Sequence, residues 1–211
     1  MAAMDTPGPL HFELIAGNPA VDFVNTVGGL RPARSREKLN TFSDLLDWAT
    51  QAKVITPAER KVLAREASAQ PAAAARALEH ARAYREAVHR VFSAVIEGQP
   101  APRQDLSLVE TEVRRAWAGR RLSPTEHGVG WQGPDALHPD GIVARLALAT
   151  AELLTTPAAG KLRVCEAVHS GECGWLYLDQ TRNHSRRWCE MGSCGNRHKA
   201  RRHYARVRGR A

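Results

Sequence analysis

Apolar residues recur every three or four positions along most of the chain, which is the spacing of amphipathic helices. The longest such pattern extends from residue 72 to about residue 97. Thr56-Pro-Ala-Glu59 combines a capping box with a first-turn proline, so a helix is expected to begin at Pro57. The remaining helices are expected over residues 19–27, 41–52, 57–68, 106–117 and 141–155.

Three segments interrupt the helical pattern. Residues 31–40 are polar and are expected to form a loop. Residues 119–139 are rich in Gly and Pro and contain Val129-Gly-Trp131, which indicates a short hairpin. Pro157-Ala-Ala-Gly160 marks the expected boundary between a helical domain at residues 10–157 and a small module at residues 160–207. The predicted fold class is therefore mainly α (α+β), with a minor β-hairpin in the helical domain.

All four cysteines of the chain lie in the small module, with the spacing C-x7-C-x15-C-x4-C. Zinc prefers four soft ligands in a tetrahedron, and a module of this size has too little apolar area to fold without a metal. An apolar strand at Trp175-Leu-Tyr-Leu178 and a helix after Gly195 would complete a treble-clef-like or ribbon-like zinc fold. We expect one structural Zn²⁺ per chain, held by Cys165, Cys173, Cys189 and Cys194.

Other uses of the cysteines have weaker support. Disulfides are unusual in the cytoplasm, and four thiolates leave zinc no open position for catalysis. A histidine in place of one cysteine stays an alternative, above all His169 in the wide first gap. The other candidate histidines are His184, His198 and His203.

Positive charge is concentrated in the module. The net charge is +8, yet residues 1–159 carry 18 Lys and Arg and 18 Asp and Glu, whereas residues 160–211 carry 12 and 4. Residues 195–211 contain seven basic residues, of which Arg210 is the last, and no acidic one. Such a run favours a polyanionic partner, and nucleic acid fits best.

The basic residues form two stripes on the expected helix, because residues three and four apart share a face. Lys199 and Arg206 belong to one stripe, and Arg197 and Arg201, the candidates for reading guanine, to the other. Asn196 is expected to brace the metal loop, and Tyr204 to pack against Trp175 and Trp188. The candidate nucleic-acid contacts are Arg186, Arg187, Arg197, Lys199, Arg201, Arg202, Arg206 and Arg208.

Asp22, Asn25 and Trp131 are the candidate ligand-binding residues of the helical domain, because small-molecule pockets place a few polar groups among apolar walls. Capping and packing are the alternative roles for these three. The chain has no nucleophile elbow, phosphate loop or metal-hydrolase motif, so no enzyme is expected.

Two sets of motifs resemble known families. Cys173-Gly-Trp-Leu-Tyr-Leu-Asp, Arg186-Arg-Trp-Cys189 and Cys194-Gly-Asn-Arg-His-Lys-Ala-Arg-Arg-His-Tyr204 resemble the CGNR zinc finger. Ala20-Val-Asp-Phe-Val-Asn-Thr-Val27 and Leu45-Leu-Asp-Trp-Ala49 resemble the ABATE domain, which precedes this finger in bacterial proteins described as stress-induced transcription regulators. The gap between Cys165 and Cys173 is wider than the usual first pair of the finger.

The resemblance implies a zinc-containing DNA-binding regulator whose helical domain binds a small-molecule effector or forms a homodimer. An RNA-binding or ribosome-associated stress factor is the main alternative. A third hypothesis makes the helical domain a small-molecule-binding protein or an enzyme, targeted by the finger. No stretch approaches the roughly 20 apolar residues of a membrane span, and residues 1–10 lack the features of a signal peptide. We expect a cytoplasmic, nucleoid-associated protein with no membrane partner.

Overall fold

Helices build most of the N-terminal part of the chain, as their apolar periodicity predicts. The computed structural model describes residues 11–32, 34–133 and 138–208. The expected domain start at residue 10, the N-terminal residues 1–10 and Arg210 lie outside these ranges. The helices are α1 (Pro19–Val24), α2 (Phe42–Gln51), α3 (Pro57–Ala69), α4 (Pro71–Ile96), α5 (Arg103–Ala118), α6 (Gly141–Leu154) and α7 (Asn196–Arg208).

Side chains that precede the helices satisfy their first N–H groups. Thr41 and Thr56 form capping boxes with Asp44 and Glu59, respectively. The side chain of Asn18 accepts a hydrogen bond from the backbone N–H of Ala20 at the start of α1. The cap predicted from the sequence at Thr56 is therefore present.

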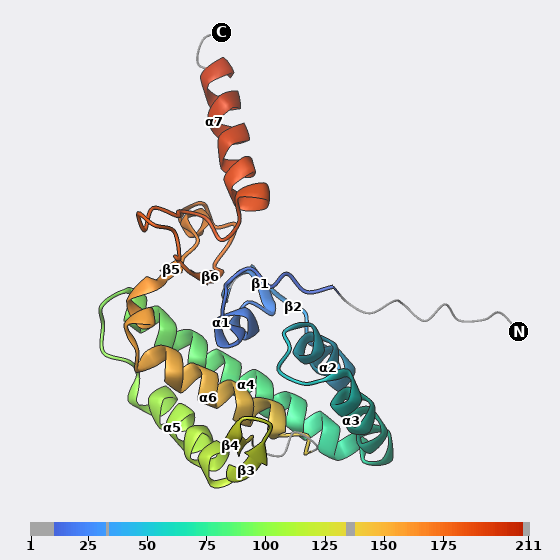
Figure 1. Cartoon of the computed structure of the whole chain (residues 1–211). Helices are drawn as coiled ribbons and strands as arrows, with labels where there is room; N and C mark the ends of the chain where they lie inside the picture. Colours follow the sequence, from blue (N-terminus) through green and yellow to red (C-terminus); the bar gives the residue numbers. More distant parts are fainter. Residues whose placement is uncertain (1–10, 33, 134–137, 209–211) are drawn as a thin grey trace, which may run out of the picture.

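The core of the helical domain is built around α4. This helix packs against α5 and α6, while α2 and α3 cover its N-terminal half (Figure 1). Tyr84 of α4 is fully buried and donates a hydrogen bond to Thr150 of α6 over 3.1 Å. The short helix α1 contacts α4 and α6, and it also contacts strand β6 (Leu176–Leu178) of the module, so it joins the two parts of the molecule.

Three small antiparallel hairpins complete the fold: β1 (Val27–Leu30) with β2 (Arg34–Glu37), β3 (Arg121–Thr125) with β4 (Gly128–Gln132), and β5 (Leu162–Val164) with β6 (Leu176–Leu178). The β3–β4 hairpin confirms the hairpin expected within residues 119–139, and β6 confirms the strand expected at Trp175-Leu-Tyr-Leu178. The β1–β2 hairpin corrects two expectations. Residues 34–37 form a strand and not a loop, and α1 ends at Val24 and not at residue 27. The chain leaves the helix because the Asn25 side chain bonds to β6, which frees Val27–Leu30 to pair with β2.

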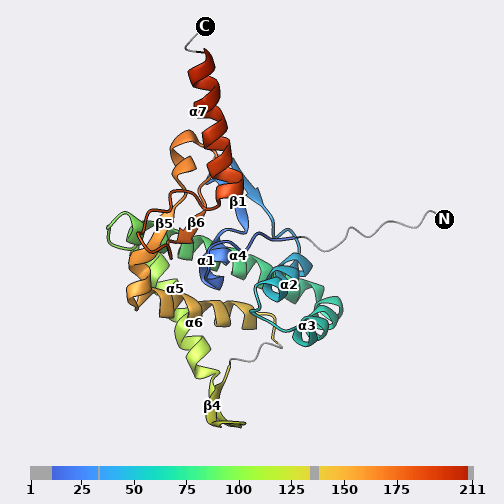
Figure 2. The same ribbon diagram turned by 45° about the horizontal axis from the view of Figure 1, so that its top comes forward.

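The C-terminal helix α7 extends away from the rest of the molecule (Figures 1 and 2). None of its residues is buried. Tyr204 is 66% exposed and lies beside His203, so it does not pack against Trp175 or Trp188 as expected. His198 takes that position, with its ring centroid 5.4 Å from that of Trp188. Within the described ranges, no helix is both long and apolar enough to cross a membrane.

Candidate metal centre and nucleic-acid interface

The four cysteines converge at the base of α7. All four are buried, and their sulfur atoms lie within 4.8 Å of one another. The Cys173 and Cys189 sulfurs are 3.8 Å apart, and those of Cys189 and Cys194 are 3.6 Å apart. A tetrahedral zinc site with Zn–S distances near 2.3 Å puts its sulfurs about 3.8 Å apart. The cluster therefore has the size of a four-thiolate zinc site.

A helical turn fills the wide gap between the first two cysteines. Residues Glu166–Ser170 form a short 3₁₀ helix, and Gly171 then reverses the chain with φ of 71°, a conformation that glycine adopts without strain. Cys165 follows β5 and Cys173 precedes β6, so pairing of the two strands brings both sulfurs to the cluster. The extra residues leave the cluster intact.

Thiols of the cluster influence one another's ionisation. Hydrogen bonds from Cys173 and Cys189 lower the pKa of Cys165 to about 2. The hydrogen bond with Cys165 raises the pKa of Cys173 to about 12 and also raises the pKa of Cys189. Four thiolates this close would repel one another, and a divalent cation such as zinc would offset their charge.

Comparison with known protein families agrees with this geometry. A family model described as "Putative stress-induced transcription regulator" (ABATE) matches residues 17–157. The chain belongs to the ABATE family. A second model, the CGNR zinc finger, matches residues 161–207. A search of curated proteins found no match. This ABATE protein thus carries a zinc finger whose four cysteines lie close enough to bind one zinc ion.

Each residue of the CGNR motif has a distinct contact. Cys194 contributes its sulfur to the cysteine cluster. A side chain at residue 195 would place its Cβ 2.5 Å from the Met191 sulfur, so glycine leaves room for Met191. The Asn196 amide donates to the carbonyl oxygen of Gly192 over 3.2 Å, which is the bracing contact expected of it. Arg197 Nη2 donates to the Cys194 sulfur over 3.2 Å. The motif therefore builds the junction between the cysteine cluster and α7.

The candidate nucleic-acid residues fall into two groups. Four of them bind other parts of the module: Arg197 contacts Cys194, Arg187 pairs with Glu166, Arg201 pairs with Glu172, and Arg186 donates to the Trp188 carbonyl over 3.0 Å. The others, whose side chains make no ion pair or hydrogen bond to another described residue, are Lys199, Arg202, Arg206 and Arg208. The side chains of this second group are exposed on α7 and have no partner among the described residues.

No histidine joins the cysteine cluster among the residues that the structure describes. His198 stacks on Trp188 and His203 lies beside Tyr204. The ring of His184 lies 3.3 Å from the Asp179 carbonyl oxygen. The geometry thus favours four sulfurs over a mixed set of ligands.

Asp22 and Asn25 are both buried and bond to backbone, and Asn25 does so across the interface between the helical domain and the module. Asp22 accepts from the Ala16 N–H over 2.9 Å, and burial raises the pKa of its carboxyl to about 6. Asn25 accepts from the N–H of Leu176 over 2.9 Å and donates to its carbonyl over 2.8 Å. Trp131 lies on the distant β3–β4 hairpin, 54% exposed (Figure 1). The structure does not bring these three side chains together.

Asn25→Ala should weaken the attachment of the module to the helical domain. It leaves the buried N–H and C=O of Leu176 without their partner, and each unsatisfied group costs about 1–3 kcal/mol. We expect urea unfolding of the zinc-loaded protein to show a lower stability by about 2–4 kcal/mol. The exposed Asn183→Ala is the control. Equal stability of the two variants would contradict this role of Asn25.

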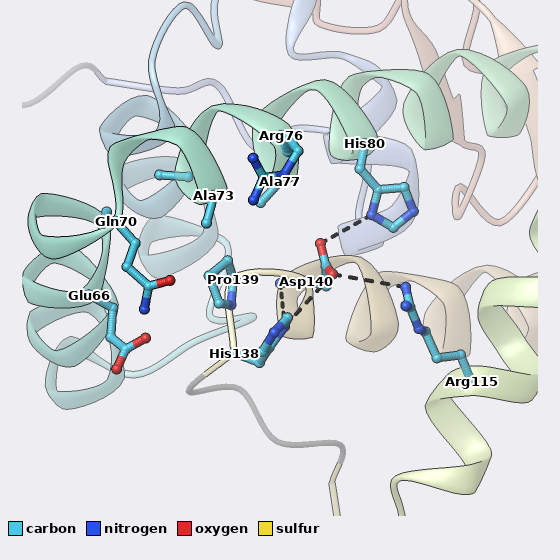
Figure 3. Close-up of a pocket in the computed structure, with 12 residues that line it drawn as sticks. Glu66, Gln70, Ala73, Arg76, Ala77, His80, Arg115, His138, Pro139 and Asp140 are labelled. Atoms are coloured by element: carbon cyan, nitrogen blue, oxygen red, sulfur yellow. Dashed lines mark hydrogen bonds and ion pairs between the residues drawn. The ribbon is translucent and has the colours of Figure 1, made fainter.

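A cavity of about 500 Å³ lies where α3, α4, α5 and the start of α6 meet, and sequence analysis did not find it (Figure 3). His80 bonds to Glu112 over 3.1 Å and to Asp140 over 3.3 Å, and the contact with Glu112 raises the pKa of the imidazole. Arg115 and His138 also face Asp140. These residues come from three elements far apart in the sequence, so no local motif marks them.

Proposed function

We propose that this ABATE protein is a DNA-binding transcription regulator in which a structural zinc ion holds α7 in position for DNA. The observation that carries the proposal is the second group of basic residues, namely Lys199, Arg202, Arg206 and Arg208. They are exposed and unpaired on a helix that projects from the molecule. Unpaired cations on one helix repel one another, and binding of a polyanion relieves this repulsion.

In this proposal Cys165, Cys173, Cys189 and Cys194 bind one zinc ion per chain. Four thiolates occupy all four positions of a tetrahedral zinc ion and leave none for a reacting water, so the role of the metal is structural. Cys194 lies two residues before α7, and Arg197 on its first turn donates to the Cys194 sulfur. The cluster thereby sets the direction in which α7 leaves the module. We assign residues 10–157 to the helical domain and 160–207 to the zinc module.

The geometry of α7 favours DNA over RNA. Its 13 residues make a rod about 20 Å long. The major groove of B-DNA admits such a helix, whereas the major groove of A-form RNA is too deep and narrow. A helix with no buried face can enter the groove along its whole length. This supports a location on the nucleoid, and DNA as the partner in place of ribosomal RNA.

The β1–β2 hairpin of the helical domain extends the basic surface toward α7. The Trp175 indole donates to the Val27 carbonyl over 3.0 Å, and the Gly174 N–H donates to the Gly29 carbonyl over 2.9 Å. Arg36 on β2 is exposed and lines the same cavity as Arg197. We therefore assign Arg36 a phosphate contact beside the groove that α7 enters.

Arg36→Gln should weaken DNA binding through the loss of one phosphate contact. We expect the slope of log K against log[salt] to become shallower by about 0.9. Fluorescence anisotropy with a labelled duplex at several salt concentrations measures this slope. Arg65→Gln, an exposed and unpaired arginine on α3, is the matched control. An unchanged slope for Arg36→Gln would show that the β1–β2 hairpin is not part of the DNA interface.

For the regulatory signal we propose the cavity between α4 and α6, with a small anion as the ligand. The Arg76 side chain lines it and makes no ion pair or hydrogen bond to another described residue, whereas His80, Arg115 and His138 already face the Asp140 carboxylate (Figure 3). Calorimetric titration with inorganic phosphate and with succinate should give binding that Arg76→Gln weakens. Absence of binding by both anions would argue against this site.

DNA binding itself is tested with the zinc-loaded wild-type protein and labelled duplex DNA, single-stranded DNA and duplex RNA. We expect tightest binding to duplex DNA at low salt. Preference for RNA would replace the proposal by an RNA-binding function, and no binding to any of the three would refute both.

A further inference from the structure

The β3–β4 hairpin has one apolar face and one polar face. Its register pairs Leu122 with Trp131 and Pro124 with Val129. Since paired residues share a face and faces alternate along a strand, these four side chains lie together. The opposite face carries Arg121, Ser123, Thr125, Gly128, Gly130 and Gln132. Such strict alternation is the pattern of a hairpin with one side buried.

The apolar face is nevertheless exposed. Leu122 is 64% exposed, Val129 72% and Trp131 54%. Trp117 at the end of α5 is 48% exposed and meets Trp131 edge-on at 5.7 Å between ring centroids. Arg120 lies over both rings, at 4.6 Å and 5.6 Å from their centroids. Within the described ranges no other element covers these side chains, and contiguous apolar patches of this kind mark interaction sites.

We propose that this apolar face binds the same face of a second copy of the chain, which forms a two-fold symmetric homodimer. An isolated two-stranded hairpin is only marginally stable in water, and stacking two apolar faces gives each hairpin the cover that its pattern requires. The hairpin lies at the end of the molecule opposite α7, so the dimer leaves both α7 helices free (Figures 1 and 2).

The charges on the hairpin support a second copy as the partner. Arg120 and Arg121 lie at its base, and Glu126 lies in the turn between the strands. In an antiparallel two-fold arrangement the turn of one hairpin reaches the base of the other. Glu126 then faces the partner subunit's Arg120, which lies over the rings of the apolar face, and the same contact occurs twice. A second copy of the chain matches both the apolar face and this order of charges by symmetry, whereas an unrelated partner would need a separate match to each.

Sedimentation equilibrium of the full-length, zinc-loaded protein tests the proposal. The chain mass is 23.2 kDa, and we expect a concentration-dependent species of twice that mass. Val129→Lys should weaken association by about tenfold or more, because it buries a charge in the interface. Val62→Lys, at an exposed valine on α3, is the matched control and should associate like the wild type.

A charge exchange provides a second test that does not depend on the apolar residues. Arg120→Glu and Glu126→Arg should each weaken the dimer, and the double variant should restore it. A wild-type protein that stays monomeric at all concentrations would overturn the proposal. So would a dimer that both Val129→Lys and the single charge variants leave unchanged. These outcomes are independent of DNA binding, since the hairpin and α7 are at opposite ends.

Discussion

Cys173→Ser or Cys194→Ser is expected to remove zinc from the protein and to unfold residues 161–207 while the helical domain keeps its structure. Both cysteines are buried, at 6% and 3% exposure, in a module whose strands have only three residues each. Metal binding to such a small module contributes on the order of 10 kcal/mol or more to its folding, far more than its apolar contacts supply. The α4–α6 core contains none of the four cysteines.

Metal analysis and limited proteolysis together measure this effect. The wild type should hold one zinc per chain and resist cleavage in the module, whereas each serine variant should hold none and be cleaved between residues 161 and 207. Arg182→Ser, an exposed change in the same module, is the control and should keep both properties. Full zinc content in the Cys173→Ser and Cys194→Ser variants would contradict the assignment of these ligands.

Removing three charges from α7 should nearly abolish DNA binding without affecting the fold. Lys199, Arg202 and Arg206 share one face of the helix and make no ion pair or hydrogen bond to another described residue. Their replacement by glutamine should make the slope of log K against log[salt] shallower by about 2.7, since each phosphate contact contributes about 0.9. At low salt the affinity should fall by roughly 100- to 1,000-fold.

The control for this triple variant removes the same residue types elsewhere. Lys61, Arg65 and Arg103 are exposed and make no ion pair to the described residues, and they lie on α3 and α5. Their triple replacement by glutamine lowers the net charge equally, so it should reduce binding only slightly. If the two triple variants lose the same affinity, overall charge and not α7 is responsible for binding.

The helices could be predicted from the sequence because their signals are local. The apolar spacing of α4 and the capping boxes at Thr41 and Thr56 lie within single segments. The β1–β2 hairpin was missed because its position depends on contacts of Asn25 and Trp175 that join residues about 150 positions apart. No local pattern indicates such contacts.

The candidate metal centre could be predicted from the sequence, but the contacts of the basic residues around it could not. Four cysteines in one short segment indicated that their sulfurs meet. The sequence did not show which arginines bind other parts of the module and which are exposed on α7 without a partner among the described residues. This difference depends on Glu166 and Glu172, which fold back to meet Arg187 and Arg201. The polar residues Asp22 and Asn25 stood out in the sequence, yet the structure uses both to bind backbone.

The central claim is that the zinc-bound module presents α7 to DNA, and the salt dependence of duplex binding tests it most directly. Five phosphate contacts, from Lys199, Arg202, Arg206, Arg208 and Arg36, predict a slope of about −4.5 for the zinc-loaded protein. After removal of zinc by a chelator, binding should weaken sharply, and it should return when zinc is added. Equal affinity and slope with and without zinc would contradict the account.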